Sequence, residues 1–154
     1  MMTESLARRE ILWSDGLAID KEGVVWKGKV REPTTVLRTE HGVKQIATVI
    51  ATPEETRVIP IWKLLSFFWY GQGIVLPRDG NAMNYSTKNV IVVSKLTHLK
   101  DVPAITDPDQ ILLVWVRYCE GVSCVEMSSV TRLFGYSIDQ FRSLIADILL
   151  SGIR

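Results

Sequence analysis

The segment that most restricts how this chain can fold is the apolar run at residues 61–70, Ile-Trp-Lys-Leu-Leu-Ser-Phe-Phe-Trp-Tyr. Its bulky apolar residues recur at helical spacing, and the run stops at Gly71, which is typical of a helix end. A helix that crosses a bilayer needs about 20 apolar residues, so this run is too short to span one. We therefore expect a helix that covers a sheet formed by other parts of the chain.

Short stretches on both sides of this helix predict a small antiparallel sheet. They are rich in β-branched residues or alternate between apolar and polar residues, and turn-forming residues separate them. The expected strands are two within 17–26 around a Lys-Glu-Gly turn, one at 42–50, one at 57–59 after the hairpin loop 52–56, and one at 90–93. A turn at 78–81 carries the sequence Arg-Asp-Gly-Asn. The predicted fold class is α+β.

The last third of the chain predicts a separate helical domain. Two prolines and two aspartates at 101–108 indicate a linker, so we expect one domain over 1–100 and another over 109–154. The expected helices of the second domain are 109–118, 127–134 and one that begins after Ser137 as its N-cap. Gly135 gives a tight turn between the last two helices, and this arrangement has a helix-turn-helix outline.

The charge distribution limits the kind of partner. With 154 residues and a formal net charge of +1, the chain is not basic enough to coat nucleic acid by bulk electrostatics alone. Residues 61–100 nevertheless contain five basic residues against Asp79 alone, for a net charge of +4, whereas residues 101–154 have a net charge of −3. Any contact with nucleic acid must therefore be local.

The few cysteines and histidines argue against metal centres and disulfides. Cys119 and Cys124 are the only cysteines, too few for a disulfide framework or a four-cysteine zinc site. The only histidines, His41 and His98, lie far apart in the sequence. We expect no metal, no cofactor and no membrane contact, and we expect a cytoplasmic location. No small-molecule substrate is evident from the sequence.

Three groups of residues between positions 16 and 94 follow one another in a recognisable order. They are Gly23-Val24-Val25, then Ile61–Leu65 with Phe67-Phe68, then Arg78-Asp79-Gly80-Asn81 with Asn84 and Asn89-Val90. In this order they resemble the homing-type HNH endonucleases of phages and introns. The resemblance covers about half of the chain and implies the ββα-metal unit of that family.

The sequence departs from this family at the residues that carry its chemistry. Pro77 stands where the family has a histidine general base, and Leu76 stands where a metal-binding carboxylate or asparagine is common. Neither side chain can accept a proton or bind a hard cation. Only Asn89 matches the remaining metal ligand, and Trp62 replaces a histidine at the start of the family's helix. The resemblance therefore implies a nuclease scaffold whose chemistry is lost.

Residues 129–142 carry a second resemblance, to helix-turn-helix DNA-binding domains. Thr131 is a small residue four positions before Gly135, where that family prefers alanine, and Phe141 and Ile145 stand where the last helix faces inward. Glutamine can pair with adenine and arginine with guanine in the major groove. The predicted DNA-binding residues are Lys63, Arg78, Lys88 and Lys95 for phosphates, and Arg132, Ser137, Gln140 and Arg142 on the helical segment.

These patterns predict a sequence-specific double-stranded DNA-binding protein, a phage-type regulator whose HNH nuclease chemistry is inactivated. One alternative is a metal-dependent HNH nicking endonuclease that uses His98 as a displaced base. Another is a protein-interaction or homodimerisation module, in which Leu144, Ile148 and Leu149 form an exposed stripe. The residues of the turn could also form a plain hairpin turn with Asx caps, and the last three helices a simple bundle.

Overall fold

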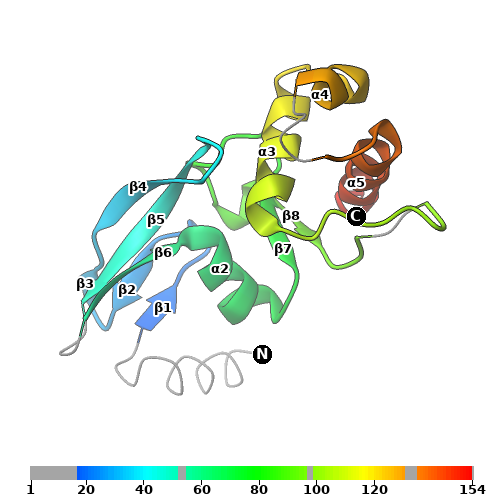
Figure 1. Cartoon of the computed structure of the whole chain (residues 1–154). Helices are drawn as coiled ribbons and strands as arrows, with labels where there is room; N and C mark the ends of the chain where they lie inside the picture. The colour runs from blue at the N-terminus through cyan, green and yellow to red at the C-terminus, as the bar shows by residue number, and fades with distance from the viewer. Residues whose placement is uncertain (1–16, 52–54, 97–98, 131–134, 154) are drawn as a thin grey trace.

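The computed structural model describes residues 17–51, 55–96, 99–130 and 135–153. Within these residues the protein is a mixed α+β structure with three small antiparallel sheets and four α-helices (Figure 1). This confirms the predicted fold class. None of the described helices is long and apolar enough to cross a membrane.

The first half of the chain forms two three-stranded sheets. Strands β1 (Leu17–Ile19), β2 (Val25–Lys27) and β3 (Val30–Arg31) form sheet A, and strands β4 (Thr34–Arg38), β5 (Lys44–Ala51) and β6 (Thr56–Pro60) form sheet B, each in sequential order. The expected strands at 17–26, 42–50 and 57–59 are confirmed, with shifts of a few residues. Strands β3 and β4 were not predicted, because Pro33 and the threonines around it interrupt the apolar alternation.

The apolar run at 61–70 is helical, as predicted. Helix α2 (Ile61–Leu65) continues into a turn of π-helix at Ser66–Tyr70, and the chain then turns at Gly71, whose φ is 80°. A positive φ is available to glycine without steric cost, so Gly71 can end the helix. Helix α2 packs against β5, β6 and β7 and buries most of its side chains there.

The second half is built on a two-stranded hairpin. Strands β7 (Ile74–Pro77) and β8 (Val90–Val93) pair in register from Ile74–Val93 to Pro77–Val90. Helix α3 (Pro108–Cys119) packs against β7, and helix α5 (Ile138–Ser151) packs against β8. The apolar core is continuous from sheet A to α5, and Ile105, in the expected linker, is only 1% exposed.

The C-terminal helices follow the expected order with two differences. Ser137 is the N-cap of α5, as predicted, but α4 (Cys124–Val130) begins three residues before the expected start at Met127. The rest of that expected helix, residues 131–134, lies outside the described residues. The exposed stripe on α5 was a wrong expectation: Leu144 and Ile148 are buried, and only Leu149, at 42%, is exposed. The two buried residues face the core because α5 packs on β8.

Candidate nucleic-acid interface

The loop between β7 and β8 is held by its own side chains. The Asp79 carboxylate Oδ1 accepts hydrogen bonds from the backbone N–H of Asn81, at 2.8 Å, and from Nδ2 of Asn89, at 2.9 Å. The same Nδ2 also donates to the backbone oxygen of Asn84, at 3.0 Å. The hydrogen bond from Asn89 is the main cause that lowers the pKa of Asp79 below its ordinary value. The two ends of the loop are therefore tied together around a charged carboxylate.

The loop is also joined to both sheets. The backbone N–H of Ile46 on β5 donates to the carbonyl oxygen of Ala82, at 2.9 Å. The carbonyl oxygen of Lys21, in the β1–β2 turn, accepts from the backbone N–H of Thr87 at 2.7 Å and from its hydroxyl at 2.9 Å. At Gly23 in the same turn, a Cβ would lie 2.9 Å from the carbonyl oxygen of Tyr85, so this close approach requires glycine.

Arg78 connects the start of this loop to the end of α5. Its Nη1 donates to the backbone oxygen of Gly152 at 3.1 Å, and its Nη2 donates to that of Val90 at 3.3 Å. The cation therefore compensates the partial negative charge at the C-terminal end of the helix. Arg78 is exposed, but its guanidinium makes these structural bonds.

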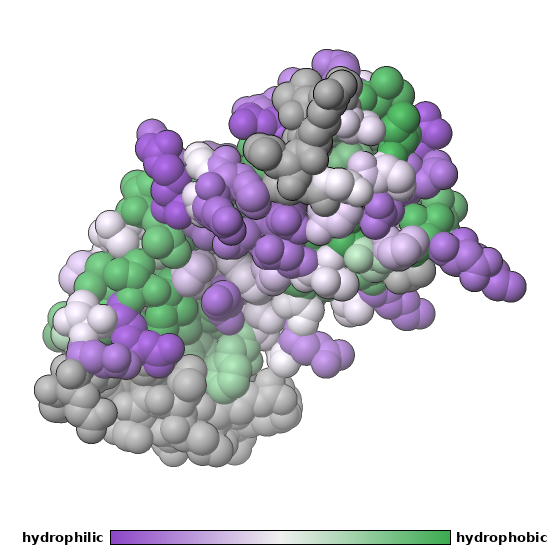
Figure 2. All heavy atoms as spheres, viewed as in Figure 1, coloured by the Kyte–Doolittle hydropathy of each residue, from purple (hydrophilic) through white to green (hydrophobic). Residues whose placement is uncertain are grey.

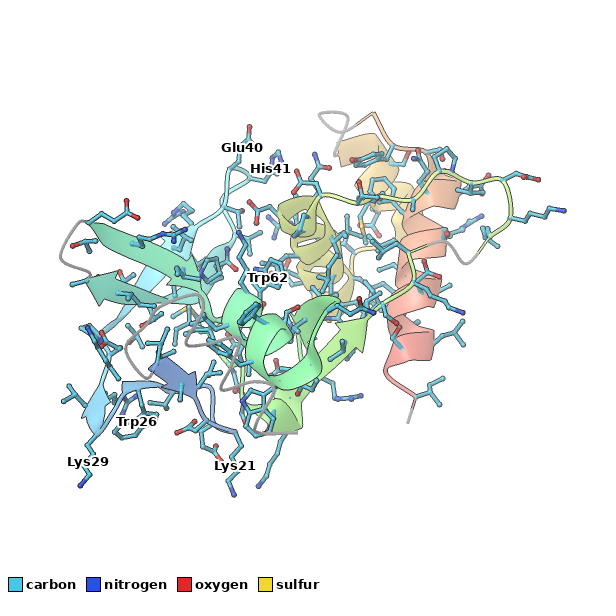
Figure 3. The ribbon with its side chains drawn as sticks, turned by 90° about the horizontal axis from the view of Figure 1, so that it is seen from below. Lys21, Trp26, Lys29, Glu40, His41 and Trp62 are labelled. Carbon is cyan, nitrogen blue, oxygen red and sulfur yellow. The ribbon has the colours of Figure 1, made fainter. Side chains whose placement is uncertain are left out.

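The contact between the loop and the β1–β2 turn brings the backbones of two lysine residues together. The bonds from Thr87 to Lys21 place Lys88 next to Lys21, and both lysines are exposed. Lys29 lies at the same side of the molecule, with Trp26 between it and Lys21 (Figure 3). We call these four residues, Lys21, Trp26, Lys29 and Lys88, the hairpin–loop surface.

Two acids flank Lys21 in the sequence: Glu22 is exposed, and Asp20 has its charge compensated by hydrogen bonds. Asp20 accepts hydrogen bonds from the backbone N–H groups of Glu22 and Val24 and from Nε1 of Trp26, at 2.9, 3.0 and 2.8 Å. Burial raises the pKa of Asp20, but these hydrogen bonds and the charge of Arg31 lower it overall. Asp20 therefore stays ionised and also fixes the orientation of the Trp26 indole.

Two of the predicted phosphate-binding lysines lie elsewhere. Lys63 on α2 lies with its Nζ 5.9 Å from the centre of the Trp62 ring, and its charge acts on Asp109 in the first turn of α3. The loop lies at the other end of α3, where Gly80 contacts Cys119. Because a helix of 12 residues spans about 18 Å, Lys63 lies far from the loop. Lys95 follows β8 at the end of the hairpin opposite to the loop. The predicted cations therefore do not form one patch.

Two of the predicted base-reading residues, Ser137 and Gln140, form the cap of α5. The hydroxyl of Ser137 accepts from the backbone N–H of Gln140, and Oε1 of Gln140 accepts from the backbone N–H of Ser137, which makes a capping box. Nε2 of Gln140 also donates to the carbonyl oxygen of Pro103, at 3.2 Å. Arg142 is exposed, and its charge acts on Cys124 of α4. Arg132, and His98 of the endonuclease alternative, lie outside the described residues.

Leu76 and Pro77, two of the positions at which the sequence departs from the HNH pattern that it resembles, are buried. Leu76 is 1% exposed, and Pro77 is buried beside it. The carbonyl oxygen of Pro77 accepts a hydrogen bond from Nε1 of the buried Trp115, at 2.6 Å. Both residues therefore contribute to packing between β7 and α3. Among the described residues, no three His, Cys, Asp or Glu side chains are grouped so that they could hold a metal ion.

Comparisons of the chain with protein families, curated proteins and solved structures found no match. Sequence reasoning missed Lys21 and Lys29, because residues 1–60 have equal numbers of acidic and basic residues and show no net charge. A signal was present in Lys21 and Lys29, which lie on either side of residues 22–28, but only the contact with Thr87 connects Lys21 to Lys88.

Proposed function

We propose that this protein binds double-stranded DNA through the hairpin–loop surface and does not cleave it. The observation that supports the proposal is the pair of hydrogen bonds from Thr87 to the carbonyl oxygen of Lys21, which places Lys21 beside Lys88. Lysines that neutralise phosphates release counterions, and this release provides most of the affinity of non-specific DNA binding. Two neighbouring cations on fixed turns can contact neighbouring phosphates.

The rigidity of the two turns supports the same interpretation. Lys88 lies within the segment tied by Asp79 and Asn89, and Lys21 lies in the turn held by Asp20. Because both backbones are already ordered, little backbone entropy is lost when phosphates bind. Of the tryptophans in the described residues, Trp62 and Trp115 are buried and cannot stack on single-stranded bases. The indole N–H groups of Trp26 and Trp69 are bonded within the protein, which fixes the orientation of both rings.

The positions of Leu76 and Pro77 support binding without hydrolysis. Hydrolysis by an HNH-type site needs a general base and a metal-bound oxygen donor where these two residues stand. Both side chains are apolar and buried against α3, so a water molecule could not be activated there. The proposal therefore describes a DNA-binding protein of HNH-like ancestry, in accord with the phage-type regulator expected from the sequence.

Sequence specificity from α5 would depend mainly on Arg142. Gln140 could pair with adenine only after breaking its bonds to Ser137 and Pro103, and this would open the cap of the helix. Arg142 is exposed and can reach a guanine without that cost. We therefore assign most of the affinity to the hairpin–loop surface and any base readout to Arg142.

A gel-shift titration with a duplex of about 20 base pairs, at several salt concentrations, tests the proposal. We expect a salt-sensitive shift, and we expect supercoiled plasmid to stay intact with Mg²⁺ or Mn²⁺. The double variant Lys21→Gln/Lys88→Gln should bind about tenfold more weakly and lower the salt slope by about two. The matched control is Lys63→Gln/Lys95→Gln, which removes the same charge at other places.

Three results would count against the proposal. Equal weakening by the two double variants would mean that net charge, and not this surface, determines binding. Metal-dependent nicking of the plasmid would contradict the proposed absence of cleavage. The absence of any shift at low salt would reject DNA binding itself.

A further inference from the structure

Within the described residues, strand β4 leaves one edge of sheet B open. The backbone N–H of Ile46 points away from β4, because it donates to Ala82, and Ile46 is the direct partner of Val36. In an antiparallel pair, two such opposed residues do not bond to each other. The N–H and C=O groups of Val36 therefore point outward, as do those of Thr34 and Arg38 on the same strand.

These outward groups have no backbone partner in the described part of the chain. The backbone groups of β4 that point towards β5 are paired with that strand. The N–H of Val49 on β5 donates to the carbonyl oxygen of Pro33, just before β4. The backbone of Thr34, Val36 and Arg38 makes no further hydrogen bond within the described residues. An edge of five residues with regular spacing can pair with an added strand.

The side chains along this edge define what strand would fit. Val36 is 52% exposed, and Figure 2 shows apolar residues at the surface over β4 and β5. Arg38 is the direct cross-strand partner of Lys44, so both cations project from the same face, and both are exposed. Like charges directly opposite each other destabilise a sheet, and an acidic side chain beside them would relieve the repulsion.

We propose that the outer edge of β4 binds an extended peptide of a partner protein as an added antiparallel strand. The peptide carries an acidic residue two positions before a β-branched apolar residue. The acidic residue lies opposite Arg38, in line with Lys44 one strand further into the sheet, and the apolar residue lies opposite Val36. A second copy of β4 paired symmetrically about Val36 fits less well, because its Thr34 would face Arg38 and leave both cations without an anion.

The probe is a fluorescein-labelled peptide, Ser-Glu-Thr-Val-Thr-Thr-Ser, titrated with the full chain and followed by fluorescence polarisation. We expect saturable binding that weakens at least about tenfold when lysine replaces the glutamate, and by a similar factor when the valine amide is N-methylated. N-methylation removes a main-chain donor of the peptide but leaves its charge and its side chains unchanged. The charge reversal Arg38→Glu/Lys44→Glu should lower the affinity for the glutamate peptide and raise the affinity for the lysine peptide.

Two proline variants separate the two edges of sheet B. Val36→Pro removes an outward N–H of β4 that the sheet does not use, and Val58→Pro does the same on β6 at the opposite edge, since Val58 lies opposite Val49. We expect only Val36→Pro to lower the affinity for the peptide, by at least about tenfold. If Val36→Pro does not fold, the N-methylated peptide tests the same hydrogen bonds on the unchanged protein.

The following outcomes would overturn the proposal. One is no saturable binding of the acidic peptide to the full chain, and another is equal binding of the N-methylated peptide. Equal weakening by both proline variants would place the peptide elsewhere. A dimer seen by light scattering that only Val36→Pro dissociates would make a second copy the occupant. Duplex binding that depends on Arg38 and Lys44 but not on Val36→Pro would assign this edge to nucleic acid.

Discussion

The guanidinium of Arg78 donates a hydrogen bond of 3.1 Å from Nη1 to the backbone oxygen of Gly152, which joins the loop after β7 to the end of α5. The sequence suggested Arg78 as a phosphate ligand, but this contact gives its guanidinium a structural role. A phosphate could bind Arg78 only by competing with two backbone carbonyl groups, those of Gly152 and Val90. The main role of Arg78 is therefore to stabilise the fold.

We expect Arg78→Ala to lower the free energy of unfolding by about 1 kcal/mol, because two hydrogen bonds from a charged but exposed donor are lost. Urea unfolding followed by tryptophan fluorescence measures this change. Arg78→Lys is the matched control: it keeps the charge but cannot bond both carbonyl groups in the same fork geometry. An unfolding midpoint equal to that of the unchanged protein, together with weaker DNA binding, would show that Arg78 acts on phosphate instead.

The lowered pKa of Asp79 predicts a pH dependence of stability. In the unfolded chain an aspartate has a pKa of about 3.9, and in the fold the hydrogen bond from Asn89 lowers it. The stabilisation from the ionised Asp79 is therefore present above about pH 4 and is lost as the pH falls through the folded pKa. Asp79→Asn should be less stable than the unchanged chain at pH 7, and this difference should shrink in acid.

The pKa of Asp79 can also be followed by NMR. Asn89→Ala removes the largest cause of the lowered pKa and should move it back towards its ordinary value. Asn84→Ala is the control, because Asn84 contributes only its backbone oxygen to the bond with Asn89. If both variants left the pKa of Asp79 equally low, the assigned role of the Asn89 side chain would be wrong.

Local signals predicted the elements of this fold well. The run at 61–70, the capping residue Ser137 and the β-branched strand at 90–93 all depend on neighbours in the sequence, and all three are confirmed. Strand β4 was missed because its backbone is paired by β5, whereas its own side chains are largely exposed and alternate weakly. The buried Ile105 shows that a proline-rich stretch can still contribute to the core.

The candidate site was harder to predict because it depends on contacts between distant segments. The charge count in residues 61–100 suggested one basic patch, but Lys63 and Lys95 lie away from the loop that carries Lys88. Sequence spacing could not show that Thr87 bonds to Lys21. Whether a polar side chain such as Gln140 is free for recognition depends on its own hydrogen bonds, and these are set by the fold.

The contact between Gly80 and Cys119 predicts a strong effect of adding a single methyl group. At Gly80 a Cβ would lie 2.5 Å from the Cβ of Cys119, and the φ of Gly80 is 80°. We expect Gly80→Ala to lower the free energy of unfolding by about 3 kcal/mol, from the positive φ and the clash together. Thermal unfolding followed by circular dichroism measures the loss.

Gly28→Ala is the matched control for this experiment. Gly28 also has a positive φ, of 63°, but nothing lies within 4 Å of the position that a Cβ would take there, so the substitution should cost only about 1 kcal/mol. The double variant Gly80→Ala/Cys119→Gly removes the clashing atom and should recover part of the lost stability. Equal destabilisation by Gly80→Ala and Gly28→Ala would mean that the loop moves away from α3 at little cost.

The same contact predicts that the Cys119 thiol reacts slowly. Part of the residue is exposed, but its sulfur lies against Gly80, and burial together with the charges of Asp79 and Glu120 raises the pKa of this thiol to about 11. A free cysteine has a pKa of about 8.5, so the reactive thiolate at pH 8 should be on the order of 100-fold scarcer at Cys119. In a Cys124→Ser variant, where Cys119 is the only thiol, alkylation by iodoacetamide should therefore be at least about tenfold slower in the folded protein than in urea. Equal rates would show that the loop does not cover the sulfur in solution, and the predicted clash at Gly80 would then also be in doubt.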